Sequence, residues 1–200
     1  MAIMLDYIAS ALIFGVLAFS IARIQININA SMYQNTHNVI TQSNAVELAR
    51  QIEYDFLKMG FKVPTASQKI FVADTNKITF KSSLLNNGVI DSVQYSAGST
   101  SEASFSSNAY DFPLKRKIGS ETELVQQYGI TRFKLTYFDV NNNVIATPIA
   151  SVSQFAAVRS IKVFFRVESY DPVYTPYDTT WAGVSWEKLI FPRNLNNLYY

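Results

Sequence analysis

The chain has 200 residues, of which 48% are hydrophobic and 16% charged, so it can bury a core but is poor in charge. Seventeen basic residues against fifteen acidic ones give a net charge of +2, which is too balanced for a nucleic-acid-binding surface. The absence of cysteine excludes disulfides, zinc–thiolate sites, iron–sulfur clusters and cysteine nucleophiles. Because His37 is the single histidine, most enzyme chemistry is disfavoured as well, and we expect no metal or organic cofactor.

The chain opens on a hydrophobic segment. Residues 8–22 (IASALIFGVLAFSIA) carry no charge, and residues 1–5 extend the run on the other side of Asp6. About 22 helical residues span about 33 Å, which matches the hydrocarbon core of a bilayer. A membrane-inserting helix is the favoured interpretation. The alternatives are a cleaved signal peptide, which normally begins with Lys or Arg, and a buried core helix.

One long helix is predicted to continue from this segment to Gly60, because no proline occurs before Pro64. Residues 25–43 are rich in Asn, Gln, Ser and Thr and carry no Asp, Glu, Lys or Arg. The last third is amphipathic, with apolar residues at three- and four-residue steps: Ala45, Leu48, Ala49, Ile52, Phe56 and Met59. The other positions are mostly charged: Glu47, Arg50, Glu53, Asp55 and Lys58. Asn44 and Glu47 resemble a capping box, which leaves a kink near Asn44 open.

After the helix the hydrophobic period changes from 3.6 to 2, which predicts strands. Six strands are expected, at residues 69–73, 77–81, 89–95, 131–138, 159–168 and 185–191. Residues 96–108 are rich in serine and predict a mobile surface loop. Because no helix-length amphipathic run follows residue 62, we predict an α+β fold in which the N-terminal helix packs on a mainly antiparallel sheet.

These patterns divide the chain into three segments. Residues 1–24 form an apolar helix, residues 25–62 continue it as an amphipathic helix, and residues 63–200 form an antiparallel head domain. The head contains an aromatic loop at residues 170–186, with Tyr170, Tyr174, Tyr177, Trp181 and Trp186. This loop is either an adhesive or inter-subunit contact surface, or a proline-pinned loop that folds back over the sheet.

Other motifs give weak candidates for a site. His37 has no neighbouring carboxylate in the sequence and is expected to be a solvated helix residue. Residues 139–143 (DVNNN) begin like a calcium-binding loop, but Val144 replaces the required glycine and Ala150 the closing glutamate, so we expect a hairpin turn. Residues 115–117 are the densest basic cluster and are expected to form a solvated strand edge rather than an anion site.

The order of these segments resembles that of type IV pilins and of the pseudopilins of type II secretion, particularly the larger minor pilins and J-type pseudopilins. The resemblance rests on the apolar start with its early acidic residue (MAIMLDYIASALIFGVLAF) and on ELARQIEYDFLKMGF at the end of the long helix. It continues through KITFKSSLLNNGVIDSVQY, DFPLKRKIG, GITRFKLTYFDVNNNVI, VRSIKVFFRVES and FPRNL. The acidic residue of that family is a glutamate at the fifth mature position, where this sequence has Asp6 one place later.

The resemblance implies a helical filament with the apolar helices in its core and the sheet domains on its surface. A carboxylate in hydrocarbon costs roughly 2.5–3.5 kcal/mol, so Asp6 needs a cation. Staggered copies would place the α-amine of Met1 in one chain beside Asp6 of the next. The alternative is an Asp6 that reaches headgroup water near the interface. Gly15, Ala11 and Ala18 are small residues near one face, which would let neighbouring helices approach closely.

We therefore predict a non-enzymatic structural subunit of a type IV pilus-like or pseudopilus-like filament, used for adhesion, motility or secretion. Its expected partners are copies of itself or other pilin-like subunits, and the membrane before assembly, with no nucleic acid. The resemblance implies the bacterial inner membrane before assembly, and then the envelope or an extracellular filament. The alternative is a monomeric membrane-anchored binding domain whose aromatic loop faces a ligand.

Overall fold

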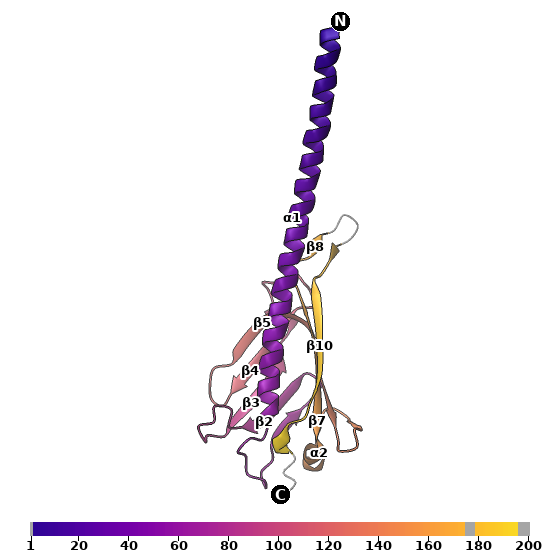
Figure 1. The fold of residues 1–200 in the computed structure, drawn as a ribbon. Helices are drawn as coiled ribbons and strands as arrows, with labels where there is room; N and C mark the ends of the chain where they lie inside the picture. Colours follow the sequence, from indigo (N-terminus) through magenta and orange to yellow (C-terminus); the bar gives the residue numbers. More distant parts are fainter. Residues whose placement is uncertain (1, 175–178, 196–200) are drawn as a thin grey trace.

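A computed structural model describes residues 2–174 and 179–195 of the chain (Figure 1). A single helix, α1 (Ala2–Leu57), projects away from the body along its N-terminal part and packs on an antiparallel sheet along its C-terminal part. This is the predicted α+β arrangement. The helix is continuous through Asn44, where the sequence left a kink open, and the Asn44 side-chain amide donates to the backbone oxygen of Tyr128 at 3.4 Å.

The end of α1 is fixed by Gly60, as predicted. The α-helix ends at Leu57, and Gly60 has a φ of 78°, in the left-handed region that favours glycine. A Cβ on Gly60 would lie 3.0 Å from the backbone oxygen of Asn194, so a side chain would also crowd the C-terminal segment. The Gly60 N–H donates to the carbonyl of Lys81 at 2.9 Å, which ties the end of the helix to the sheet.

All strand pairs that the structure describes are antiparallel. The spatial order of the main sheet is β1 (Ile70–Ala73), β2 (Lys77–Ser82), β3 (Asp91–Ala97), β4 (Phe112–Ile118), β5 (Leu124–Phe138), β7 (Ser160–Glu168) and β10 (Gly183–Ile190). The short strand β6 (Val144–Ile145) pairs with the end of β5. A separate two-stranded sheet, β8 (Val173–Tyr174) and β9 (Thr179–Thr180), lies beside α1.

Short helical turns complete the described chain. The helix α2 (Val152–Ala157) is capped by Ser151, and the 3-10 turns η1 (Thr100–Glu102) and η2 (Arg193–Leu195) lie in loops. The sheet is curled, so that β5 meets the β1–β2 turn although it is not a neighbour of β1 or β2 in the strand order. At this point the backbone N–H of Leu135 in β5 donates to the carbonyl of Thr75 at 2.7 Å. The backbone N–H of Ile149 also donates to the carbonyl of Ala73, which covers the outer edge of β1.

The six predicted strands are all present, and three parts of the main sheet were not predicted: β4, the first half of β5 and the short strand β6. The strand predicted at residues 131–138 begins earlier, at Leu124, as the first half of β5. For residues 115–117, which lie within β4, the sequence predicts only a solvated basic strand edge. That prediction is wrong, because β4 lies between β3 and β5, and Arg116 points into the protein.

The core lies between the last third of α1 and one face of the sheet. Leu48, Ile52 and Phe56 are fully buried, as the amphipathic pattern predicted. Alternate residues of β5 and β7 face them, with Phe133 opposite Phe165 and Leu135 opposite Val163 in the register of the two strands. Full burial of each large apolar side chain contributes roughly 1.5–3 kcal/mol, so this docked third holds the helix to the head.

Candidate functional site

The N-terminal half of α1 is uncovered in the described structure. Residues 3–36 are all exposed, and large apolar side chains among them keep 63% to 75% of their surface: Ile3, Met4, Ile8, Leu12, Phe14 and Phe19. The helix is long and apolar enough to span a membrane, and none of its most apolar window is buried. The alternative of a buried core helix is therefore wrong. Monomeric soluble proteins rarely expose apolar patches of this size, and such patches are typical of surfaces that contact a membrane or another protein.

Asp6 lies within this exposed apolar half. No ion pair involves Asp6 among residues 2–174 and 179–195. The nearest basic side chain along the helix is that of Arg23, about 26 Å further on. Met1, whose α-amine was predicted to neutralise Asp6 of another copy, lies outside the described residues. The side chains of this chain's own span therefore supply Asp6 with no cation.

The predicted small residues share one side of the helix. Ala11, Gly15, Ala18 and Ala22 follow one another at spacings of four, three and four residues, which places them in one row along an α-helix. A Cβ added to Gly15 would meet no atom within 4 Å, so the packing of this chain does not require a glycine there. A row of small residues is the feature that lets two helices in a membrane approach closely.

A polar segment separates the apolar half from the docked half. No Asp, Glu, Lys or Arg occurs between Arg23 and Glu47, and the first buried residue of α1 is Thr41, at 3% exposed. Within the segment, the rings of Tyr33 and His37 meet edge to face at 4.3 Å. His37 is thus a helix-surface residue that packs against its own helix.

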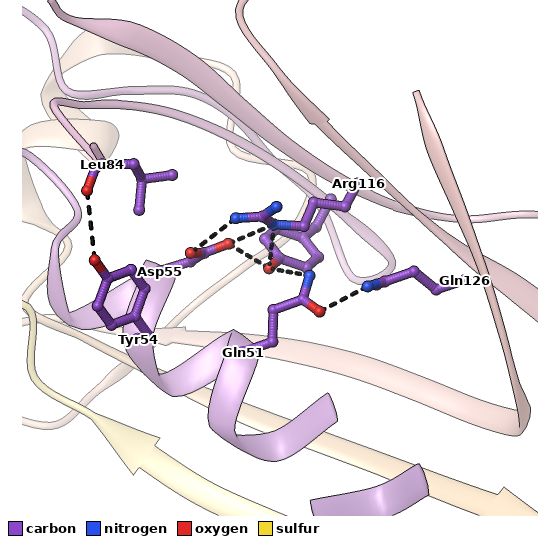
Figure 2. Close-up of polar contacts among 7 residues, drawn as sticks. Gln51, Tyr54, Asp55, Leu84, Arg116 and Gln126 are labelled. Carbon is purple, nitrogen blue, oxygen red and sulfur yellow. Dashed lines mark hydrogen bonds and ion pairs between the residues drawn. The ribbon is translucent and has the colours of Figure 1, made fainter. Parts of the chain in front are cut away.

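The docked half of α1 carries a buried carboxylate at the centre of a polar network (Figure 2). Asp55 has no exposed surface and accepts two hydrogen bonds from Arg116, from Nε to Oδ2 at 2.7 Å and from Nη2 to Oδ1 at 3.1 Å. The Tyr95 hydroxyl donates to Asp55 Oδ2 at 2.5 Å. Gln51 Nε2 donates to the Tyr95 hydroxyl at 3.3 Å, and Gln126 Nε2 donates to Gln51 Oε1 at 2.6 Å. The network joins α1 to β3, β4 and β5.

The electrostatics of this network favour a charged Arg116 and a neutral Tyr95. Burial raises the pKa of Tyr95 well above its usual value, and the charge of Asp55 raises it further. Burial by itself lowers the pKa of Arg116, but the interactions with Asp55 and Tyr95 together outweigh that effect, so the pKa is raised. Two parallel N–H···O bonds make the Asp55–Arg116 pair specific in geometry, so it fixes where α1 lies on the sheet.

The sequence interpretation placed Asp55 on the solvent side of α1, and the structure corrects this. Asp55 lies seven residues, or about two turns, after the fully buried Leu48 and therefore on the same face. Its partner Arg116 was counted in a solvated basic cluster. The spacing from Leu48 was the signal that could have identified Asp55, whereas nothing in the sequence indicated the pairing with Arg116.

Tyr170, the first residue of the aromatic loop, folds back onto the head. Its hydroxyl donates to the backbone oxygen of Gln127, and its ring meets that of Phe105 edge to face at 5.0 Å. The Ser107 side chain and backbone N–H donate to the Tyr170 carbonyl at 2.7 and 3.0 Å. The serine-rich loop, which was expected to be mobile, is thus tied to the aromatic loop at this point.

The other aromatic candidates are placed differently. Trp186 lies on β10 and stacks on the buried ring of Phe165 at 5.0 Å, while remaining partly exposed. Trp181 is half-buried just before β10. Tyr177 and the side chain of Tyr174 lie outside the described residues. Of the predicted contact residues, Trp186 therefore has the clearest geometry for contact with another molecule, because it is rigidly held and partly open.

The DVNNN segment forms the predicted hairpin turn between β5 and β6. Asp139 Oδ1 accepts the backbone N–H groups of Asn141 and Asn143, each at 2.8 Å. These hydrogen bonds lower the pKa of Asp139, with the backbone N–H of Asn143 as the largest cause. In the part of the chain that the structure describes, no group of three or more His, Cys, Asp or Glu residues is placed to hold a metal ion.

A second buried carboxylate, Asp111, was not predicted. It is 2% exposed, and neither carboxylate oxygen makes a hydrogen bond of good geometry with the described residues. Burial raises its pKa, and the negative charge of Glu168 adds to the rise, while the nearby Ser106 hydroxyl opposes it. The charged form of Asp111 is therefore disfavoured at this position, and it does not stabilise the head.

Comparison with known proteins adds no relative, because no family model matches the sequence and no curated protein matches it. The functional assignment therefore depends on the sequence pattern and on the geometry of α1.

Proposed function

We propose that this protein is a structural, non-enzymatic subunit of a pilin-like filament. The observation that carries the proposal is the division of one continuous helix into two surfaces. One half of α1 is packed on its own head, and the other half is apolar, exposed and unpartnered among the described residues. A helix of this kind can be held in a membrane by its free half and can later exchange lipid for the helices of other copies.

Asp6 distinguishes this role from that of a simple anchor. A carboxylate in hydrocarbon costs roughly 2.5–3.5 kcal/mol, and an anchor without it would be more stable in the membrane. In a bundle of staggered copies, the α-amine of one chain supplies the missing cation for Asp6 of the next. The row formed by Ala11, Gly15, Ala18 and Ala22 supports the close helix packing that such a bundle needs.

The proposed partners are other copies of this chain or other pilin-like subunits, and the membrane before assembly. By its resemblance to pilins and pseudopilins, the filament belongs to a bacterial envelope, with the subunit in the inner membrane before assembly. Adhesion, motility and secretion are the uses that such filaments serve.

The test compares Asp6→Ala and Asp6→Glu with the unaltered chain in its own host. Electron microscopy of material sheared from the cell surface, together with detergent extraction of the envelope, reports the filament, and membrane fractionation reports insertion. We expect Asp6→Ala to insert normally but to be lost from filaments, and Asp6→Glu to be incorporated. Ser10→Ala, a neutral change one turn away, should have no effect.

Two results would contradict the proposal. One is an Asp6→Ala chain that enters filaments as well as the unaltered chain does. The other is an unaltered chain that stays monomeric in the membrane and never appears in a fibre. The second result would favour the alternative of a membrane-anchored binding domain.

A further inference from the structure

A groove runs along the head between α1 and the edge strand β10, which lie side by side (Figure 1). Val46 and Ala49 from the helix and Val184 and Trp186 from the strand give the groove its apolar lining. Among the described strands β10 pairs only with β7, so no further strand covers this side of the head. Trp186 is held in place by its stacking on Phe165. The groove is thus a preformed and rigid apolar surface.

Two charged residues line the groove, Glu53 and Arg50, of which Glu53 has a partner in the same chain and Arg50 is exposed to solvent. The partner of Glu53 is Lys188 of β10, with Nζ 2.8 Å from Oε2. A charged occupant would lose hydration without a buried partner, which is costly. The lining therefore fits an apolar helix that carries no charge.

The same chain displays such a helix. Residues 24–40 of α1, which precede the first buried residue of the helix, contain no Asp, Glu, Lys or Arg. They expose a row of apolar side chains, the row A residues: Ile24, Ile28, Met32 and Val39. Ile28 and Val46 are eighteen residues apart, which is about five full turns, so they point in the same direction. Row A therefore runs directly into the groove and forms one continuous strip with it.

A second row of exposed apolar residues lies on the opposite side of the helix. It consists of the row B residues, Ile26, Tyr33 and Ile40, at seven-residue spacing. The next position at this spacing is the charged Glu47, so row B does not continue into an apolar surface of the head. The two rows provide a matched comparison within one helix.

We infer that the groove between α1 and β10 receives the uncharged segment of α1, residues 24–40, from a second copy of this chain, through its row A side chains. The inference rests on the proposed filament and names the surface of the head that contacts the neighbouring helix. The helices are parallel and staggered along their axes, with a row A residue of one copy beside Val46 of the other. This geometry sets the stagger between about 10 and 33 Å, because each residue adds about 1.5 Å along a helix.

The chain contains no cysteine, so single cysteines can report this contact without background. One copy carries Gln42→Cys, an exposed position of the groove lining one turn before Val46, and the second carries a cysteine at one position of row A or row B. The two variants are expressed together, filaments are isolated, and disulfide formation is measured on a denaturing gel after mild oxidation. Ser120→Cys, an exposed position in the turn after β4, replaces Gln42→Cys as the control.

We expect disulfides between Gln42→Cys and at least one row A position, with a maximum that gives the stagger. Row B positions and the Ser120→Cys control should cross-link at least ten-fold less. If filaments form but row A does not exceed row B, the inference is wrong while the proposed function stands. If no filaments form with the unaltered chain, the proposed function fails and this inference fails with it.

Discussion

Asp55 of α1 and Arg116 of β4 form a bidentate ion pair at a position where the aspartate has no exposed surface. Taking two charges out of water is expensive, and a buried pair offsets this cost only when both partners are present. Any other register of α1 on the sheet would separate these charges and leave them unpaired, which costs free energy. The pair therefore favours the observed position of the helix chiefly by making other positions less stable.

The first prediction concerns this pair. Asp55→Ala leaves the Arg116 charge partly buried without its partner and should lower the free energy of unfolding by about 3–5 kcal/mol. The double variant Asp55→Ala/Arg116→Met should lose clearly less than the sum of the two single variants. Chemical unfolding of the full chain in detergent, followed by tryptophan fluorescence, measures both effects.

The surface pair of Lys162 and Glu187 provides the control for that prediction. Its Nζ and Oε1 lie 3.6 Å apart and both side chains are substantially exposed, so Glu187→Gln should cost less than about 1 kcal/mol. Two outcomes would show that burial does not govern the energy of the Asp55–Arg116 contact. One is that Asp55→Ala and Glu187→Gln lower the free energy of unfolding equally. The other is that the double variant at the buried pair loses the sum of what its two single variants lose.

Those parts of the fold that depend on hydrophobic periodicity could be predicted from the sequence. The docked stripe of α1 and the inward faces of β5 and β7 follow from spacing alone, because only one register buries those side chains together. The strand β4 was missed because Pro113 and three consecutive basic residues obscure its alternation, in which Leu114 and Arg116 share a face.

The functional surfaces divide in the same way. The free half of α1, Asp6 and the row of small residues are visible in the sequence because they belong to one uninterrupted helix. The groove between α1 and β10 brings together residues more than 130 positions apart, Val46 and Trp186 among them, and no local pattern indicates their contact. The burial of Asp111 likewise depends on segments that are distant in the sequence, because Ile130 of β5 and Glu168 of β7 lie near its carboxylate.

The second prediction concerns Gly129 in β5, which has a φ of 77° and whose Cβ would lie 2.2 Å from the backbone oxygen of Glu168. The register of β5 with β7 shifts directly after it, between Ile130 and Arg132. Gly129→Ala should therefore destabilise the head by more than the roughly 1–2 kcal/mol that a left-handed alanine costs, or should prevent folding.

Gly88 is the matched control, because it has a φ of 84° but open space around its Cβ position. Gly88→Ala should show only the backbone cost. Thermal unfolding of the two variants separates the effects, and a Gly129→Ala chain as stable as Gly88→Ala would mean that the strands have room to move apart.

The third prediction concerns the pH dependence that Asp111 causes. Burial raises its pKa above the unfolded value, so the folded state holds the proton more tightly than the unfolded state does. Stability from this group is present below the unfolded pKa and is lost as the pH rises through the folded pKa. Asp111→Asn removes the charge, so its stability relative to the unaltered chain should increase from pH 3 to pH 7, as measured by unfolding midpoints.

Asp139 should behave in the opposite way. Its pKa is lowered by the backbone N–H of Asn143, so it stabilises the folded state above the unfolded pKa, and this contribution is lost as the pH falls. Asp139→Asn should therefore lose stability relative to the unaltered chain as the pH rises over the same interval. If both variants drift in the same direction with pH, the burial of Asp111 is not the cause of its effect.

The last prediction concerns the part of α1 between the apolar N-terminal segment and the head. Residues 25–36 are helical and exposed, and none of them is buried by the described part of the head. Asn, Ile and Thr each cost up to about 0.7 kcal/mol relative to Ala in a helix, and helices without tertiary contacts are marginal in water. In the detergent-solubilised monomer, backbone amides of residues 25–36 should exchange with deuterium orders of magnitude faster than those of residues 48–57.

In filaments the same amides should become protected, because neighbouring helices cover them, and mass spectrometry of proteolytic peptides resolves the two segments. Equal protection of both segments in the monomer would show that the helix is stable without partners, and unchanged exchange in filaments would show that no neighbour covers it.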